Sequence, residues 1–264
     1  MGHAIMLQGT GSSVGKSTIV AALCRIFSQE GYRVAPFKSQ NMGSDTVRLG
    51  RNQEISGVQY RQALAAQVEP VVEMNPILLK PVSDLDSEVI VNGQSVGVMS
   101  AQEYIAYKPK LLEGIRDALS FLKANYDLVI IEGAGSPAEV NLRAHDLANM
   151  AVAEMAEAPV FLVADIHWGG VFAYIHGTMK LLLPRERARV QGLMINKFSG
   201  DATRFAEGAD ILTELTGVPA LGVIPLLRAF SFEENTDWDR LADHIRDHLD
   251  LKPFYKNLSL GGLS

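Results

Sequence analysis

The chain of 264 residues carries 24 Lys and Arg against 30 Asp and Glu, which gives a net charge of −6. This acidic balance argues against nucleic acid as the main partner, and no apolar run approaches the ~20 residues that a membrane-spanning helix needs. The first residues lack the pattern of a signal peptide, and Cys24 is the only cysteine, so no internal disulfide can form. We therefore expect a cytoplasmic protein with one large domain.

The first predicted strand, 4–8, leads directly into a glycine-rich turn and then into a helical pattern over 16–29. The turn reads Gly9-Thr-Gly-Ser-Ser-Val-Gly-Lys-Ser-Thr18 and has the Gly-Lys-Ser order of a phosphate-binding loop. In such a loop, backbone N–H groups surround the phosphates, Lys16 reaches the β and γ oxygens, and the Ser17 hydroxyl binds Mg²⁺. The residues expected to contact the nucleotide here are Thr10, Gly11, Ser12, Ser13, Val14, Gly15, Lys16, Ser17 and Thr18.

This loop departs from the strict G-x-x-x-x-G-K-[ST] pattern. Gly9 lies one residue too early, and Thr10 takes the place of the first glycine. Gly11 stands five positions before Lys16, where ATPases of the partition type carry a second lysine. The glycine therefore argues against that branch of ATPases.

Along the rest of the chain, short apolar runs alternate with helical patterns. The apolar runs predict buried parallel strands over 33–37, 127–131, 159–164, 190–195 and 220–224. The helical patterns cover 54–66, 101–123, 145–157, 170–183, 204–216 and 237–249. The alternation predicts an α/β fold with a doubly wound, mostly parallel sheet of the P-loop NTPase type.

Two segments break this alternation. Residues 89–91 and 94–99 flank the dipeptide Asn92-Gly93, which predicts a small antiparallel hairpin near 88–99 at the edge of the sheet. The last stretch, 252–264, shows little periodicity. We therefore expect one domain over 1–251 and a loosely structured tail over 252–264.

Polar side chains that follow strands are candidate ligands, because ligands of such sheets bind beyond the carboxyl ends of the strands. Glu132 ends a strand before several small residues, which suits an Mg²⁺ ligand, with an acid on a solvated loop as the alternative. Asp165 is either a second acid near the metal or an N-cap. Asn196 either faces a purine edge or is a plain turn residue. We expect nucleotide contacts from Asn196, from Lys197 and from Pro225, which is a candidate wall for the base.

Two further charged residues are candidates for the same site. Lys38 follows the strand 33–37, where a lysine holds a substrate carboxylate or the transferring phosphoryl group unless it is simply a surface residue. Glu54 opens the next predicted helix, where it completes the Mg²⁺ shell or interacts favourably with the helix dipole.

The cysteine and the histidines carry less information. Cys24 lies among apolar residues in the helix after the loop, and we expect it in the core. It has no His and acid placed with it to hydrolyse an amide. His244 and His248 are four residues apart on a predicted surface helix without a third ligand, so a solvated face is the better interpretation.

Several segments together resemble one family. They are Gly9-Thr-Gly-Ser-Ser-Val-Gly-Lys-Ser17, Val34-Ala-Pro-Phe-Lys-Ser-Gln-Asn-Met42, Met74-Asn-Pro-Ile-Leu-Leu-Lys-Pro81, Glu132-Gly-Ala-Gly-Ser-Pro-Ala-Glu-Val-Asn-Leu142, Gly169-Gly-Val-Phe-Ala173 and Leu221-Gly-Val-Ile-Pro225. They look like the ATP-dependent synthetase domain of the cobyric acid synthase family, which belongs to the corrinoid amidotransferases and is related to dethiobiotin synthetase. The likeness covers about residues 4–250.

The resemblance implies a ligase that uses ATP and Mg²⁺ to activate a peripheral carboxylate of a corrinoid as an acyl phosphate, which ammonia then converts into an amide. Carried over to this chain, Lys16, Lys38 and Asn41 are the catalytic residues, with Gln40 beside them in the cleft. Ser17, Glu132 and Glu54 hold the metal, and Asn196 faces the adenine.

The chain departs from the family pattern in three places. The family's C-terminal glutaminase domain is missing from the sequence, so three alternatives follow: the chain is a fragment, a separate glutaminase subunit supplies the ammonia, or free ammonia is used. The stretch after Met42 keeps Glu54 and Gln59 but few of the other polar positions of the family. The family's Asp-Arg-Gly-Gly becomes His167-Trp168-Gly169-Gly170. An aromatic face there favours a flat or apolar ligand, unless these positions only pack.

Three alternatives stay open from the sequence. One is a paralogue that performs the same chemistry on another carboxylate, and the altered segments favour it. Another is a nucleotide-dependent switch or assembly ATPase, against which Gly11 argues. A carboxylation like that of dethiobiotin synthetase is disfavoured by the long match over 132–142. For the oligomeric state, a homodimer is the alternative to a monomer.

Overall fold

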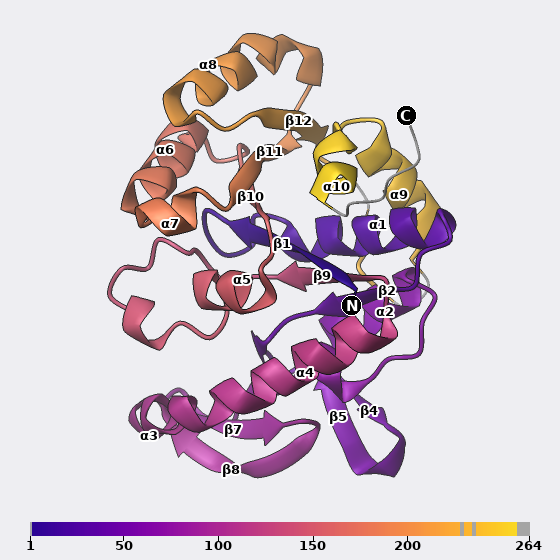
Figure 1. Cartoon of the computed structure of the whole chain (residues 1–264), viewed down its shortest axis with the longest axis vertical. Helices are drawn as coiled ribbons and strands as arrows, with labels where there is room; N and C mark the ends of the chain where they lie inside the picture. Colours follow the sequence, from indigo (N-terminus) through magenta and orange to yellow (C-terminus); the bar gives the residue numbers. More distant parts are fainter. Residues whose placement is uncertain (1, 228–229, 234–235, 258–264) are drawn as a thin grey trace.

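The computed structural model describes residues 2–227, 230–233 and 236–257. At its centre lies a six-stranded sheet in the order β12-β11-β10-β1-β9-β2, with all neighbouring strands parallel (Figure 1). This confirms the doubly wound α/β prediction. The strands are β1 (His3–Gly9), β2 (Val34–Phe37), β9 (Leu128–Glu132), β10 (Val160–Asp165), β11 (Val190–Phe198) and β12 (Ala220–Pro225).

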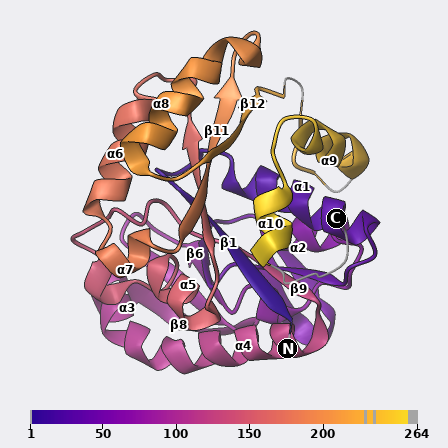
Figure 2. The same cartoon turned by 45° about the horizontal axis from the view of Figure 1, so that its top comes forward.

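Helices cover both faces of this sheet, which is why its strands read as continuous apolar runs rather than as alternating ones (Figure 2). One face packs against α1 (Lys16–Gln29), α9 (Trp238–Arg246) and α10 (Lys252–Asn257). The helices that contribute to the other core are α4 (Leu111–Asn125), α5 (Met150–Ala156), α6 (Val171–Leu181) and α8 (Ala206–Thr216). None of the described helices is long and apolar enough to cross a bilayer.

The predicted hairpin is present, but it belongs to a second sheet. Asn92 and Gly93 both have positive φ and form the two-residue turn between β7 (Asp86–Val91) and β8 (Gln94–Ser100). These strands continue through β6 (Ile77–Pro81) to β3 (Gln40–Met42) in a four-stranded sheet separate from the central one. The chain crosses from the central sheet to this second sheet directly after β2, at Lys38 and Ser39.

Three predicted helix boundaries were wrong. The helix expected over 54–66 begins only at Gly57, because Gln53–Ser56 form β5, which pairs with β4 (Thr46–Leu49); α2 is Gly57–Ala65. The pattern over 101–123 divides into α3 (Ala101–Tyr107), a 3-10 turn that contains Pro109, and α4. The helix expected from 145 begins at Met150.

The tail differs from its prediction where the structure describes it. Residues 252–257 form α10, and the ring of Phe254 is buried and stacks on Phe161 of β10 at 4.0 Å between centroids. This aromatic contact ties the segment to the central sheet. The rest of the expected loose tail, 258–264, lies outside the described residues.

Candidate active site

The phosphate-binding loop joins β1 to α1 at the carboxyl edge of the central sheet. Gly15 has φ +100 and is the N-cap of α1, and no side chain caps this helix end, so its first N–H groups are available to an anion. The Nζ of Lys16 donates to the carbonyl oxygens of Gly11 at 2.8 Å and Gly135 at 3.0 Å. The ammonium is therefore held inside the loop, where a phosphate would bind.

Glu132 is the centre of the hydrogen-bond network beneath this loop. Register pairing of β1 with β9 sets Leu7 beside Glu132, so the carboxylate ends its strand next to the loop. It is 1% exposed, and its Oε1 accepts from Ser17 Oγ at 2.8 Å and from Lys38 Nζ at 2.7 Å. Its Oε2 accepts from Gln62 Nε2 at 2.8 Å. The structure thus brings together Lys16, Ser17, Lys38 and Glu132, as the sequence predicted.

Burial, neighbouring charges and hydrogen bonds shift the pKa values of two members of this cluster. Burial by itself would raise the pKa of Glu132, but the nearby Lys38 charge and the three hydrogen bonds outweigh it and hold the pKa below its usual range. Burial lowers the pKa of Lys16 to about 8, with Glu132 raising it and Lys38 lowering it further. A phosphate bound at Lys16 would favour the charged ammonium again.

Two buried glutamines of α2 connect this cluster to Asn41, and the sequence reasoning gave neither a role. Gln62 donates to Glu132 and also to the Ser17 carbonyl, and its Oε1 accepts from Gln59 Nε2 at 3.1 Å. Gln59 Oε1 accepts from Asn41 Nδ2 at 2.8 Å. The sequence feature that indicates such a role is the spacing of the two glutamines, which lie three residues apart on the buried face of a helix. Buried polar side chains need hydrogen-bond partners.

Two residues near the carboxyl end of β11 hold the loop from outside. Asn196 Nδ2 donates to the Val14 carbonyl at 2.8 Å, and Lys197 Nζ donates to the Ser13 carbonyl. Lys197 Nζ also lies 2.8 Å from Oδ2 of Asp165. These contacts support the loop backbone, while the expected contact of Asn196 with adenine stays a prediction.

Asp165 has a role that the sequence reasoning did not consider. It pairs with Lys197 and accepts from the His167 N–H at 2.8 Å. The N-cap of α6 is Gly170, without a side-chain cap, so the N-cap interpretation of Asp165 was wrong.

Glu54 and Pro225 lie apart from the cluster. Glu54 is on β5, where its carboxylate pairs with Lys80 at 2.8 Å and accepts from the Thr46 hydroxyl. These bonds outweigh the effect of burial and lower its pKa. The Pro225 carbonyl accepts from His244 Nε2 at 3.0 Å. Neither residue lines the cleft above the phosphate-binding loop, and the structure does not bring Glu54 to Ser17 and Glu132.

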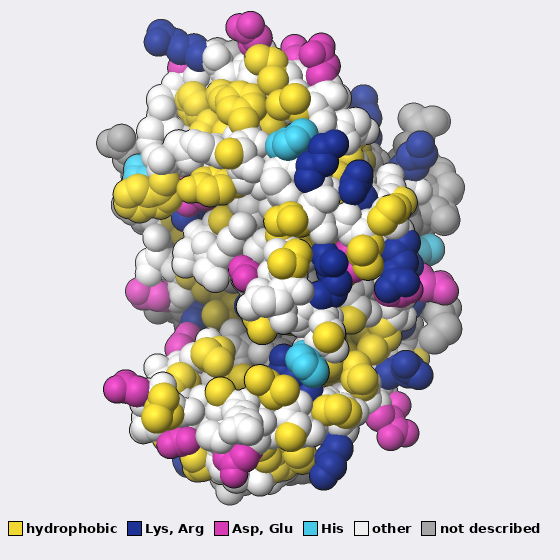
Figure 3. Space-filling view, turned by 90° about the vertical axis from the view of Figure 1, so that its left-hand side faces the viewer, with side chains coloured by type: hydrophobic (Ala, Val, Ile, Leu, Met, Phe, Trp, Pro, Cys, Tyr) yellow, Lys and Arg dark blue, Asp and Glu magenta, His cyan; other side chains and the backbone are white. Residues whose placement is uncertain are grey.

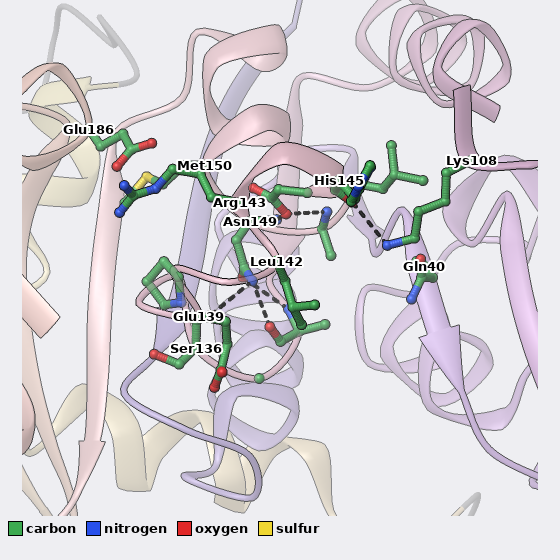
Figure 4. Close-up of a pocket in the computed structure, with 16 residues that line it drawn as sticks. Gln40, Lys108, Ser136, Glu139, Leu142, Arg143, His145, Asn149, Met150 and Glu186 are labelled. Atoms are coloured by element: carbon green, nitrogen blue, oxygen red, sulfur yellow. Dashed lines mark hydrogen bonds between the residues drawn. The ribbon is translucent and has the colours of Figure 1, made fainter. Parts of the chain in front are cut away.

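A cleft of about 730 Å³ opens over the loop, and a smaller cavity of about 330 Å³ adjoins it (Figure 4). The cleft is lined by Ser12, Ser13, Gly15, Lys16, Ser17, Thr18, Lys38, Gln40, Asn41, Met42, Glu132, Ala134, Gly135 and Lys197. The expected catalytic residues Lys16, Lys38 and Asn41 therefore share one cleft.

A third cavity lies at the outer side of the loop. It is lined by Thr10–Val14, Asp165, Trp168, Tyr174 and Lys197, and Trp168 is 81% exposed. Trp168 of the altered pair thus lines a different cavity from the one that contains Lys38 and Asn41. The two cavities share Ser12, Ser13 and Lys197.

Comparison with known proteins places this site in a family. Residues 5–237 match the model of the CobQ/CobB/MinD/ParA nucleotide binding domain, which covers most of the chain and includes every element of the loop cleft. The chain belongs to this family. Its nucleotide-binding character agrees with the free helix end and the internal lysine of the loop.

The similar curated relatives are named cobyric acid synthase. A probable cobyric acid synthase of Methanothermobacter thermautotrophicus is 54% identical over 84% of this chain and 44% of its own length. Those of Photorhabdus laumondii and Alkaliphilus metalliredigens are 53% and 49% identical over 86% and 93% of this chain. The chain spans about half the length of the curated relatives it matches. Among solved structures, the signal recognition particle receptor FtsY from Elizabethkingia anophelis covers 92% of this chain and 63% of its own, with 17% identity and a TM-score of 0.48.

Proposed function

We propose that this chain is an ATP- and Mg²⁺-dependent ligase that amidates a peripheral carboxylate of a corrinoid through an acyl phosphate. One observation carries the proposal: the Glu132 carboxylate, the Ser17 hydroxyl and the Lys38 ammonium meet within hydrogen-bond distance beneath the phosphate loop. The corrinoid is inferred as the substrate because relatives that are about half identical to this chain are named cobyric acid synthase.

The site suits Mg²⁺ held jointly by protein and nucleotide. Within the described residues no three His, Cys, Asp or Glu side chains are grouped to hold a metal by themselves. Mg²⁺ commonly takes only one or two protein oxygens and completes its shell with water and phosphate oxygens. Glu132 and Ser17 supply a carboxylate and a hydroxyl at the right place, and the ion would neutralise charge on the phosphates.

The side chains of the cleft then have separate tasks. The N–H groups at the start of α1 and the Lys16 ammonium hold the phosphates, and Lys38 neutralises charge as the γ-phosphoryl group moves. An oxygen of the substrate carboxylate bonds to the γ-phosphorus while the bond to ADP breaks. Ammonia then bonds to the acyl carbon, phosphate leaves, and the nitrogen loses a proton to give the amide.

The nitrogen comes from outside the chain in this proposal. Cys24 is fully buried in α1, and burial raises the pKa of its thiol, so a nucleophilic thiolate is disfavoured. Free ammonium or a separate glutaminase subunit would supply the ammonia.

The test is a turnover assay of the chain with ATP, Mg²⁺, ammonium chloride and a panel of corrinoid carboxylates. We expect ADP release to require the corrinoid and ammonium together, and the product to be detected by mass spectrometry as one amide per ADP. ATP hydrolysis that is independent of every carboxylate would instead support the switch ATPase.

A further inference from the structure

The 330 Å³ cavity next to the loop cleft has no function assigned so far. It is formed mainly by the segment 134–150, which follows β9, and is closed by Gln40 and Lys108 on one side and Glu186 on the other (Figure 4). Gln40, Ala134 and Gly135 line both this cavity and the loop cleft. The two spaces therefore meet at Gln40, on the route from the cavity to the phosphates.

We propose that this cavity receives one carboxylate-bearing arm of the acceptor substrate, and that Tyr104 orients Gln40 to hold the reacting carboxylate where the cavity meets the cleft. The inference rests on the proposed function, since it places the acceptor of that reaction. It assigns a binding role to Gln40 and a positioning role to Tyr104.

The geometry of Gln40 supports this role. The Tyr104 hydroxyl of α3 donates to Gln40 Oε1 at 2.8 Å, and the Tyr104 ring is buried at 8% exposure. Burial raises the pKa of this phenol, so the hydroxyl stays a donor. The Gln40 side-chain oxygen is therefore occupied by the Tyr104 hydroxyl. The NH₂ group of the same amide has no hydrogen-bond partner among the described residues. This group donates to a carboxylate oxygen.

Two basic side chains that line the cavity donate to neutral carbonyl oxygens and add positive charge for an anionic guest. Lys108 donates to the carbonyl of His145 at 2.9 Å, with Asp146 as a nearby opposite charge, and Arg143 donates to the carbonyl of Leu181 at 2.6 Å. The acidic lining residues are Glu139, Asp146 and Glu186. The Asp146 carboxylate accepts from the backbone N–H groups of Ala148, Asn149 and Ala151, and Glu186 accepts from that of Leu183.

The size and walls of the cavity limit what enters. Leu142, Leu147 and Met150 give it apolar walls, which suit the methylene groups of a short aliphatic arm. A volume of about 330 Å³ is at the low end for a small-molecule pocket, so a macrocycle would stay at the mouth. Figure 3 shows that the face on the left-hand side of Figure 1 mixes hydrophobic, basic and acidic side chains.

The test compares two conservative variants of the same helix. Tyr104→Phe removes the hydroxyl that holds Gln40 and keeps the ring, whereas Tyr107→Phe removes a hydroxyl from α3 that makes no contact with Gln40. The acceptor probe is cobyrinic acid diamide, a corrinoid that carries free peripheral carboxylates. Equilibrium dialysis of this diamide gives the acceptor Kd, and a fluorescent ATP analogue gives the nucleotide Kd. Gln40→Leu and a melting curve of each variant complete the set.

We expect Tyr104→Phe to raise the acceptor Kd about 5-fold, because one hydrogen bond that orients Gln40 is lost. Gln40→Leu should raise the acceptor Kd by on the order of 10-fold. The nucleotide Kd should stay unchanged in both, and Tyr107→Phe should change neither constant. An unchanged acceptor Kd in Tyr104→Phe, or an equal rise in the nucleotide Kd, would overturn the proposal, and so would a parent chain that does not bind the diamide. A parent chain that binds the diamide normally but never amidates it refutes the proposed reaction and leaves the cavity assignment standing.

Discussion

The Nε2 of Gln62 lies 2.8 Å from Oε2 of Glu132, so a helix side chain fixes the carboxylate that faces the phosphate loop. The other carboxylate oxygen is shared by Ser17 and Lys38. Gln62 in turn bonds to Gln59, and Gln59 to Asn41, so the orientation of Glu132 depends on two glutamines that do not line the loop cleft.

Gln62→Leu should raise the Mg²⁺ concentration needed for half-maximal turnover by about 10-fold, since partners of metal ligands typically contribute that much to metal affinity. The measurement is a Mg²⁺ titration of ADP release at saturating ATP. Gln191→Leu, at an exposed position of β11, is the matched control and should titrate like the parent chain. Equal titrations for Gln62→Leu and the control would remove Gln62 from the site.

Glu132→Gln and Glu54→Gln should differ in the same titration. Glu132→Gln removes the carboxylate under the loop, so we expect a higher Mg²⁺ requirement and, because buried Lys38 loses its counter-charge, a loss of about 3 kcal/mol in the free energy of unfolding. Glu54 is paired with Lys80 instead, so Glu54→Gln should leave the Mg²⁺ dependence unchanged. A raised requirement in Glu54→Gln would show that this hairpin moves onto the nucleotide.

Lys16→Ala should lower turnover by on the order of 10²-fold or more, because the ammonium neutralises the γ-phosphoryl group as it transfers. The fold should persist, since Lys16 bonds only to the loop carbonyls of Gly11 and Gly135 within its own site. Steady-state ADP release and a circular dichroism melting curve check the two parts. Near-normal turnover in the folded variant would contradict the loop assignment.

The purified chain should use ammonium and not glutamine as the nitrogen donor. Cys24 is its only cysteine and is buried in the core, so no thiol is placed to attack a glutamine side chain. Glutamate release from glutamine is the direct assay, and any release by the pure chain counts against the prediction. Cys24→Ser should keep its nucleotide turnover.

The pair His167 and Trp168 should have little influence on the acceptor. Trp168 lines the cavity at the outer side of the loop, away from Gln40 and Lys38. We therefore expect the change of His167→Asp with Trp168→Arg to leave the KM for cobyrinic acid diamide unaltered. A clear fall in that KM would instead support the hypothesis that these aromatic residues select another substrate.

The positions of the strands in the central sheet were determined by the sequence itself. Each strand of the central sheet is a short apolar run bounded by polar or glycine-rich segments, and burial on both faces requires that pattern. The phosphate loop was equally readable, because a strand, a glycine-rich turn and a helix lie together within residues 3–29. Glu132 and Lys38 could be placed near it, since the carboxyl ends of parallel strands meet at one edge of a sheet.

The tertiary structure alone decided the partners of these residues. Gln62 reaches Glu132 from 70 positions away, Glu54 turns to Lys80 because residues 46–56 form a hairpin, and Asn196 supports Val14 across 182 positions. Tyr104 and Gln40 meet only because α3 packs against the second sheet. Local patterns encode backbone conformation and burial, but the direction of a polar side chain depends on which distant donor or acceptor the fold brings within about 3 Å of it.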